Sequence, residues 1–414
     1  MFHRKGRLLA SAVATASVML VAIGGTASTS GASSSGEHTL TIGVLTDVTG
    51  LGATNASTIP LGVKAAIGEL AAKAGYKITY DVADTTTSPS VALSAAQKLV
   101  EQDHVFAVIA NSAITFSAAP YLASQGVPVV GAAIDSTEWV TDRNMFSVIG
   151  TENYTKVYSQ WGTIYKKLGV TNLASLGYAI SPSSAGAANG VAKSVELAGI
   201  KVGYLNASFP FGSTNVAPVA LALKSAGVNG LSASIETSTE FALINQLKDE
   251  GVNLKVLNAT GYGGDLFLGG SGGTKTAQNE YFLTSFEPVE LHTAATEQLV
   301  NAMKTYAGVK SEPTFAEYQG YLSVEALLDG LKAAGSNPTQ ASFINAMLKM
   351  GTWNGGGLYG PGHSVGFALA DRGLVSGADN CGYILKFSGT TFHLVPGLDP
   401  VCGKTIPGQT VSDS

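Results

Sequence analysis

The sequence predicts an α/β protein of parallel strands and helices, arranged in two similar lobes. In the stretch 40–74, an apolar strand (40–45) leads through a Gly- and Thr-rich loop into an amphipathic helix. The same order of strand, loop and helix recurs as far as residue 258. The recurrences form two rounds, one before residue 150 and one after it. Strands that alternate with helices in this way indicate parallel sheets built from βαβ units.

The elements of the first round are predicted from apolar runs and from helix-start signals. Pro60 and Pro89 each occupy a position typical of the first turn of a helix. After the opening unit, the predicted strands are 78–82, 105–110, 126–131 and 146–149, and the predicted helices are 88–102 and one that ends at residue 124.

The second round and the C-terminal part follow the same rules. The second round is expected to contain helices 153–168, 187–198, 215–226 and 240–250 and strands 173–178, 201–205, 230–235 and 255–258. A polar loop, 180–186, and a Gly-rich loop, 260–273, join them. The predicted C-terminal elements are a crossing segment at 281–286, helices 292–306, 314–334 and 339–350, and a hairpin of strands 381–387 and 392–395.

The N-terminus has the residue pattern of an export signal. Three basic residues in the first seven precede an apolar run of small residues (8–23) and a stretch suited to cleavage (25–32). A transmembrane anchor is the alternative, but the run is short and rich in Ala, Ser and Thr. We therefore expect residues 1–36 to be a signal peptide and a flexible leader. No cysteine lies there to accept a lipid, so we expect an exported protein, periplasmic, extracellular or associated with the cell surface, without a lipid anchor.

Charge and cysteine content narrow the function further. The net charge is −5 and no run of Lys or Arg occurs after the first seven residues, which argues against a nucleic-acid partner. Cys381 and Cys402 are the two cysteines, and an even pair in an exported chain favours a disulfide. A metal pair or a catalytic thiol would need partners, and the six histidines are scattered. No cofactor or metal is expected.

Motifs for catalysis are missing from the sequence. There is no G-x-S-x-G nucleophile motif, and the glycine-rich run from Gly261 has neither the dinucleotide-binding nor the P-loop pattern. Several acidic residues lie near predicted loops without an assignable partner: Asp47, Asp84, Asp135, Glu236 and Asp265. For most of them, a solvated loop carboxylate is the simplest interpretation. We therefore expect a protein that is not an enzyme.

Small polar residues follow several of the predicted strands. The loops 111–115 and 132–137 each come directly after an apolar strand. Free N–H groups at a helix start, together with Ser and Thr hydroxyls, suit a carboxylate or another small anion. At any single loop, ordinary helix capping is the better explanation. Several such loops in one half, matched by polar loops in the other, favour a ligand-binding cleft.

An ordered set of segments resembles a known family. The segments TIGVLTDVTGLGA, AAQKLVEQDHVFAVIA, GVPVVGAA, MFSVIG and YQGYLSVEALLDGLKAAG resemble the periplasmic solute-binding proteins of branched-chain amino acid ABC importers. The resemblance implies two Rossmann-like lobes joined by three hinge crossovers. It implies a first lobe of residues 38–152 plus 286–377 and a second of 153–285 plus 378–414. The pair Cys381–Cys402 would then lie within the second lobe.

The resemblance also implies a function. Family members close two lobes on a ligand and dock to a membrane permease, so we expect a monomer that captures a small polar or amphipathic organic solute, an amino acid or a related compound. Two alternatives remain open. One is a ligand-sensing receptor that acts through a separate partner, and the other is an exported hydrolase.

The family's ligand contacts transfer unevenly. Ser112 matches the serine that holds a ligand carboxylate, whereas the expected tyrosine and acid of the second lobe are missing, with Tyr178 and Glu236 as substitutes. The first loop also has no aromatic residue at 51–55. These departures argue against a standard α-amino acid as ligand. The predicted ligand-binding residues are Thr49, Leu51, Asn111, Ser112, Ala113, Ala133, Ile134, Asp135, Tyr178, Ser184, Glu236 and Tyr262.

Overall fold

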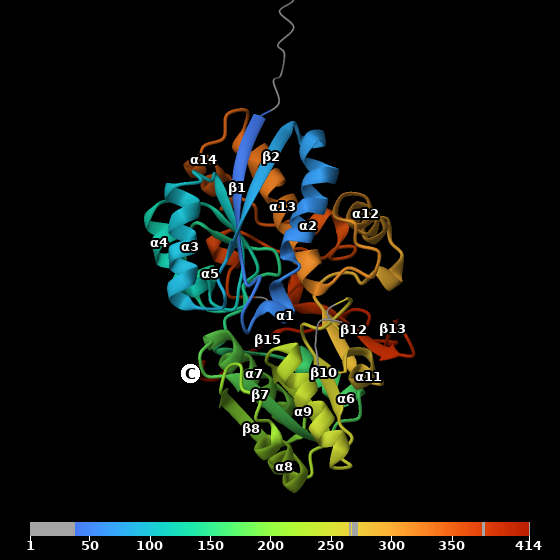
Figure 1. The fold of residues 1–414 in the computed structure, drawn as a ribbon. Coiled ribbons are helices and arrows are strands. Elements are labelled where there is room, and N and C mark those ends of the chain that lie inside the picture. The colour runs from blue at the N-terminus through green and yellow to red at the C-terminus, as the bar shows by residue number, and fades with distance from the viewer. Residues whose placement is uncertain (1–37, 265, 267–271, 375–376, 414) are drawn as a thin grey trace, which may run out of the picture. The chain divides into compact units, whose positions relative to one another are not determined.

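The computed structural model describes residues 38–264, 266, 272–374 and 377–413 (Figure 1). The predicted export signal and leader, residues 1–36, lie outside the described residues, as does Asp265. Among the helices in the described ranges, none has both the length and the apolar character that a bilayer crossing requires.

The first sheet has five parallel strands in the order β2-β1-β3-β4-β5. Its strands are β1 (His38–Thr46), β2 (Tyr76–Asp84), β3 (Ala107–Asn111), β4 (Val129–Gly131) and β5 (Met145–Ser147). The direction of strand addition reverses between β1 and β3, and ligands of open α/β sheets bind in the crevice at such a switch point. The register pairs Thr46 with Asn111, so the loops that begin at Asp47 and Ser112 leave the sheet side by side.

Helices cover both faces of this sheet, so its strands are buried on both sides. Val44 packs in one hydrophobic cluster with residues of α2 (Ile59–Ala66) and α13 (Phe315–Ala334). The next residue, Leu45, points to the opposite face and packs in a second cluster with residues of α3 (Pro89–Glu101) and α4 (Ala119–Ser124). We call this sheet and its helices the first lobe.

The second sheet contains the strands of the second round and of the C-terminal hairpin, in the order β13-β12-β11-β10-β9-β7-β8, with β14 paired to β12. Its parallel strands are β7 (Asn172–Tyr178), β8 (Lys201–Phe209), β9 (Gly230–Ser234), β10 (Lys255–Asn258) and β11 (Tyr281–Thr284). Antiparallel strands β12 (Cys381–Ser388), β13 (Thr391–Leu394) and β14 (Val401–Cys402) complete it. Here the switch point lies between β7 and β9. This sheet and its helices form the second lobe.

The remaining helices and strands complete the two lobes. The α-helices are α1 (Ala53–Ala56), α5 (Glu138–Thr141), α6 (Gln160–Lys167), α7 (Pro182–Leu197), α8 (Ala217–Ala226), α9 (Thr237–Asp249), α11 (Gly273–Ala277), α12 (Ala294–Ala302) and α14 (Gln340–Met347). The π-helical turns are η1 (Ile67–Ala71) and η5 (Met303–Ala307), and the 3₁₀ turns are η2 (Ala72–Ala74), η3 (Thr115–Ser117), η4 (Val289–Leu291), η6 (Gly355–Gly357), η7 (Leu369–Asp371) and η8 (Ala378–Asn380). A further two-stranded sheet pairs β6 (Lys156–Tyr158) with β15 (Thr405–Thr410).

Two sequence predictions for the second round were wrong in part. The predicted helix 153–168 is instead strand β6 followed by the shorter helix α6, because β6 pairs with β15 from the far C-terminus. The predicted loop 180–186 is mostly helix. Helix α7 begins at Pro182, where the Ser181 hydroxyl accepts a hydrogen bond from the Ser184 N–H as a helix cap.

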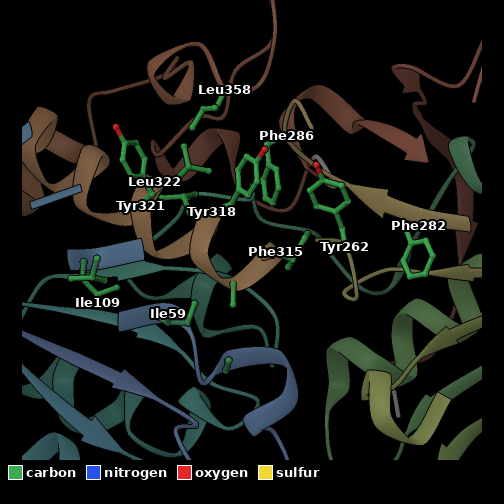
Figure 2. Packing of buried hydrophobic residues seen from close by; sticks show 14 of the residues in the cluster. Ile59, Ile109, Tyr262, Phe282, Phe286, Phe315, Tyr318, Tyr321, Leu322 and Leu358 are labelled. Atoms are coloured by element: carbon green, nitrogen blue, oxygen red, sulfur yellow. The ribbon is translucent and has the colours of Figure 1, made fainter. Parts of the chain in front are cut away.

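An aromatic cluster connects the end of the second sheet with α13. The rings of Phe286 and Tyr318 stack with centroids 4.2 Å apart, and Tyr262 lies 6.2 Å from Tyr318 (Figure 2). Phe315, at the first turn of α13, packs against Phe286 at 5.2 Å. Because Phe286 follows β11 and enters the segment that leads to α12 and α13, this cluster packs around one of the crossings between the lobes.

The C-terminal hairpin and the disulfide pairing of the cysteines agree with the sequence prediction. Strands β12 and β13 pair antiparallel, and Cys381 is bonded to Cys402 with an S–S distance of 2.09 Å. The two cysteines face each other in the register of β12 and β14. The lobe boundaries drawn from the family resemblance remain a prediction.

Reduction of this disulfide should destabilise the protein. The bridge closes a loop of 21 residues, for which the chain-entropy relation gives about 3 kcal/mol. We expect a lower melting temperature in the presence of a thiol reductant, measured by calorimetry. A Cys381→Ser/Cys402→Ser variant is the control and should melt at the same temperature with and without reductant. An unchanged melting temperature of the unsubstituted protein after complete reduction would contradict the prediction.

Candidate functional site

The loop after β1 is held in place by the carboxylate of Asp84, at the end of β2. Asp84 accepts hydrogen bonds from the Thr49 hydroxyl (2.6 Å), the Thr49 N–H (3.1 Å) and the Val48 N–H (3.0 Å). Burial alone would raise the pKa of Asp84, but these bonds and one from the Thr86 N–H lower it overall. Asp84 therefore acts as an ionised brace for the loop, and Thr49 is committed to that brace.

Asp47 lies at the switch point of the first lobe and occupies the donors of the Ser112 loop. The Ser112 hydroxyl donates to Asp47 at 2.5 Å and the Ala113 N–H donates at 2.9 Å. The Thr85 hydroxyl is a third donor. Asp47 is 1% exposed, and burial raises its pKa although these hydrogen bonds lower it. A Cβ at Gly52 would collide with the carboxylate, so the glycine leaves room for it.

Asn111 ends β3 beside this group. Its side-chain N–H donates to the Gln319 side-chain carbonyl of α13. The Asn111 carbonyl oxygen and the Gln319 amide nitrogen are both buried and have no hydrogen-bond partner among the described residues. One acceptor and one donor are therefore left over at the edge of the switch point.

The loop after β4 contacts the second lobe directly. The Ser183 hydroxyl donates to the Ile134 carbonyl at 2.6 Å, and the Ser181 hydroxyl donates to the Asp135 carbonyl at 3.0 Å. The Tyr154 hydroxyl donates to the Ala133 carbonyl at 3.0 Å. The start of α7 thus meets the backbone of this loop, which brings three predicted site residues to the boundary between the lobes.

The Asp135 side chain points into the first lobe. Its carboxylate accepts hydrogen bonds from the Phe116 N–H (2.5 Å) and the Trp139 indole N–H (2.9 Å), and the residue has no exposed surface. Burial and then the charge of Glu138 raise the pKa of Asp135 well above its ordinary value. The carboxyl group therefore holds the loop, and the backbone of Asp135 faces the second lobe.

Asn55 of α1 forms a second connection between the lobes. Its amide N–H donates to the hydroxyls of Thr260 (2.5 Å) and Thr237 (3.3 Å), and its carbonyl accepts from the Thr237 N–H at 3.3 Å. One side chain thus connects the start of α9 with the loop after β10. We call this group the Asn55 latch. It holds the two lobes together in the described structure.

Removing the latch should loosen the contact between the lobes. In Asn55→Ala, the amides of residues 53–56 and 235–237 should exchange hydrogen about tenfold faster, because hydrogen bonds of about 1 kcal/mol each are lost. Hydrogen exchange followed by mass spectrometry measures this. Asn215→Ala is the matched control, since Asn215 is exposed and its side chain makes no described hydrogen bond. Equal exchange in the two variants would contradict the role of the latch.

On the second lobe, Tyr178 and Glu236 meet at the switch point between β7 and β9. The Glu236 N–H donates to the Tyr178 hydroxyl at 3.0 Å, and burial raises the pKa of Tyr178 to about 12. The Glu236 Oε2 atom is buried and has no hydrogen-bond partner among the described residues. Burial, followed by the charge of Asp47 on the other lobe, raises the pKa of Glu236 to about 8.

The other predicted site residues are distributed more widely. Ser184 is used within its lobe, where its hydroxyl accepts from the Tyr178 N–H and donates to the Ser234 carbonyl. Leu51 is 52% exposed and lies against Gly212 of the second lobe. Tyr262 is fully buried in the aromatic cluster (Figure 2). Its hydroxyl donates to Glu290 at 2.7 Å.

The structure therefore brings most of the predicted residues to the boundary between the lobes, at the two switch points and in the loop after β4. Sequence reasoning missed the roles of Asp47, Asn55, Ser181 and Ser183. Asp47 carried a usable signal, because it and Ser112 are each the first residue after neighbouring buried strands. Asn55 carried none, since its partners are 182 and 205 residues away.

Comparisons with known proteins agree with this architecture. The sequence profile of the periplasmic binding proteins matches residues 39–388. No curated protein matches the sequence significantly. The leucine-binding protein LivK of Thermotoga maritima superposes with a TM-score of 0.70 at 17% identity, over 88% of this chain and 99% of that one. LivJ of Streptococcus pneumoniae, in complex with isoleucine, gives 0.70 at 17% identity, over 89% and 99%.

A further similar structure is a solute-binding protein of an ABC transporter from R. palustris in complex with benzoate. It has a TM-score of 0.72 at 14% identity, over 90% of this chain and 98% of that one. Two doubly wound lobes with facing switch points define the type I periplasmic binding fold. The chain belongs to the periplasmic binding protein family.

Proposed function

We propose that this protein is an exported, non-enzymatic binding protein that captures a small polar or amphipathic organic solute between its lobes and delivers it to the permease of an ABC transporter. The ligand binds where the two switch points face each other. Thr49, Leu51, Ala133, Ile134 and Asp135 border this region on the first lobe, and Tyr178, Ser184 and Glu236 support it on the second. Tyr262 lies in the aromatic cluster and is not assigned to the region. Asn111, Ser112 and Ala113 lie at its base.

The single observation that carries the proposal is the placement of polar groups at both switch points. Asp47 and Glu236 come from different lobes, and the charge of one raises the pKa of the other. In open α/β sheets this is the place where ligands bind. Similar structures hold isoleucine or benzoate, so the fold accommodates more than one class of small organic solute.

Closure of the lobes supplies the mechanism. The Asn55 latch and the contacts between α7 and the loop after β4 exist in the closed arrangement. A ligand shifts the protein towards this arrangement by as much as its affinity differs between the open and closed forms. The permease then recognises the closed form, and the binding protein works as a monomer in the periplasm or at the cell surface.

A solute carried through purification tests the proposal. Native mass spectrometry of the protein should show one small organic molecule per chain, released on denaturation and then identified. If no solute is retained, the protein is screened against a broad library of small metabolites by thermal shift. Absence of any stabilising compound, or turnover of an ester or amide substrate, would contradict the proposal.

A further inference from the structure

The donors at the start of the Ser112 loop are occupied by a carboxylate of the protein itself. Ser112 and Ala113 direct both of their donors to Asp47, at 2.5 and 2.9 Å. Thr85 adds a third donor, and Gly52 provides the space. A carboxylate on a ligand would therefore find these donors occupied and would approach a negative charge.

The opposite lobe adds a second acidic group. Glu236 follows β9, with its Oε2 atom buried and without a hydrogen-bond partner among the described residues. In the described part of the chain, no salt bridge involves Asp47 or Glu236. Buried carboxylates are normally paired or hydrogen-bonded. The described residues supply no donor to this oxygen, so a ligand can supply one.

Aromatic side chains lie next to Glu236. The Tyr178 hydroxyl accepts the Glu236 N–H, and the Tyr178 ring packs against Phe211 at 4.8 Å and Phe209 at 6.1 Å. Phe211 is half-buried. A carboxylate attracts an organic ammonium group through charge, and aromatic side chains in the same region can add a cation–π contact.

We propose that the region between the two switch points selects an organic ammonium compound without a carboxylate, held by Glu236 and attracted by the charge of Asp47 from the opposite lobe. The inference rests on the proposed function, because it assigns the ligand class of the same site. The cation donates to the unpartnered Glu236 oxygen and is attracted by Asp47, which interacts electrostatically with Glu236 from the first lobe. Attraction to both lobes also favours closure, since the ammonium group is nearest to both acidic groups when the lobes are in contact.

Matched sets of compounds test the ligand class by calorimetry. The amines 3-methylbutylamine and 2-phenylethylamine are compared with leucine and phenylalanine and with the acids 4-methylpentanoate and 3-phenylpropanoate. We expect each amine to bind at least about tenfold more tightly than the amino acid and the acid with the same side chain. The reason is that the negative charge of Asp47 repels the carboxylate of those two compounds.

A variant tests the role of Glu236. Glu236→Gln keeps the size of the side chain and should lower amine affinity about 10- to 100-fold, the effect of losing a hydrogen bond to a charged group. Glu196→Gln, at an exposed position of α7, is the control and should bind amines unchanged. Equal affinity in both variants would overturn the inference.

The outcomes separate the inference from the proposed function. If an acid or an amino acid binds more tightly than its amine, or if the solute found in the purified protein has no cationic group, the ammonium inference fails and the binding function stands. If none of the compounds binds and neither retained solute nor stabilising metabolite is found, both fail.

Discussion

Glu236→Gln should be more stable than the unsubstituted protein in the absence of ligand, and the difference should grow with pH. Burial and Asp47 raise the pKa of Glu236 from its ordinary value of 4.5 to about 8. Between these two values the folded protein binds more protons than the unfolded chain, so folding stability falls as pH rises. Glutamine does not ionise and escapes this loss.

The size of the effect follows from the width of this interval. Each pKa unit corresponds to about 1.4 kcal/mol, so the gain approaches at most about 5 kcal/mol above pH 8 and is near zero at pH 4.5. Opening of the lobes hydrates the carboxylate and reduces the gain. Urea unfolding at pH 5, 7 and 8.5 measures it. If the difference in unfolding free energy between the two proteins is the same at all three pH values, the pKa of Glu236 is not raised by folding. Greater stability together with weaker amine binding is expected of a residue kept for function.

Amine affinity should rise steeply with pH up to about pH 8. In the ligand-free protein the Glu236 carboxyl is protonated below its pKa, and an ammonium ligand must displace that proton. Affinity should therefore increase about tenfold for each pH unit below 8 and level off above it. Between pH 6 and 8 the expected increase is about a hundredfold.

Other titratable groups near Glu236 do not reverse this direction. Asp47 faces it from the first lobe, and burial raises the pKa of Asp47 as well, so its ionisation also favours a cation at higher pH. Tyr178 and Glu240 are the further groups, and the pKa of Tyr178 is about 12. Burial raises the pKa of Glu240 well above its ordinary value, and its carboxylate accepts from the Asn258 amide.

Calorimetry of 2-phenylethylamine at pH 6, 7, 8 and 9 provides the profile. Titrations in buffers with different ionisation enthalpies should show about one proton released per ligand at pH 7. The Glu236→Gln variant is the control and should give a flatter profile. An affinity that falls with increasing pH would indicate an anionic ligand and would contradict the assignment.

Much of the fold follows from local sequence patterns. Apolar runs and helix-start signals predicted the parallel strands of both sheets except β11, which was predicted as a crossing segment, and the C-terminal hairpin was predicted correctly. Helix α13 also follows its signals, because Thr314 and Glu317 form a reciprocal capping box. These elements are determined by residues close to one another in the chain.

The failures have a common cause in pairing between distant segments. Residues 156–158 have a helical pattern but form β6, because they pair with β15. That strand lies almost 250 residues further along the chain. Asp47 was interpreted as a solvated loop carboxylate, yet the register of β1 and β3 places it under the Ser112 loop with 1% exposure. Local propensity carries no information about either partner.

The candidate site was predictable as a region and less so in its chemistry. Placement after neighbouring parallel strands identified the loops that meet between the lobes. The family resemblance suggested that Ser112 holds a carboxylate of the ligand, whereas in the structure Ser112 donates to the carboxylate of Asp47. Glu236 was predicted as the acid of the second lobe, and its unpaired buried oxygen supports that role.

Small-angle X-ray scattering with and without a bound amine tests the central claim of closure on a ligand most directly. The purified protein is first freed of retained solute and then saturated with the matched amine that binds most tightly. We predict a smaller radius of gyration with the amine, because the ammonium group draws Asp47 and Glu236 together. Superimposable profiles, at a concentration at which calorimetry shows full occupancy, would contradict the account.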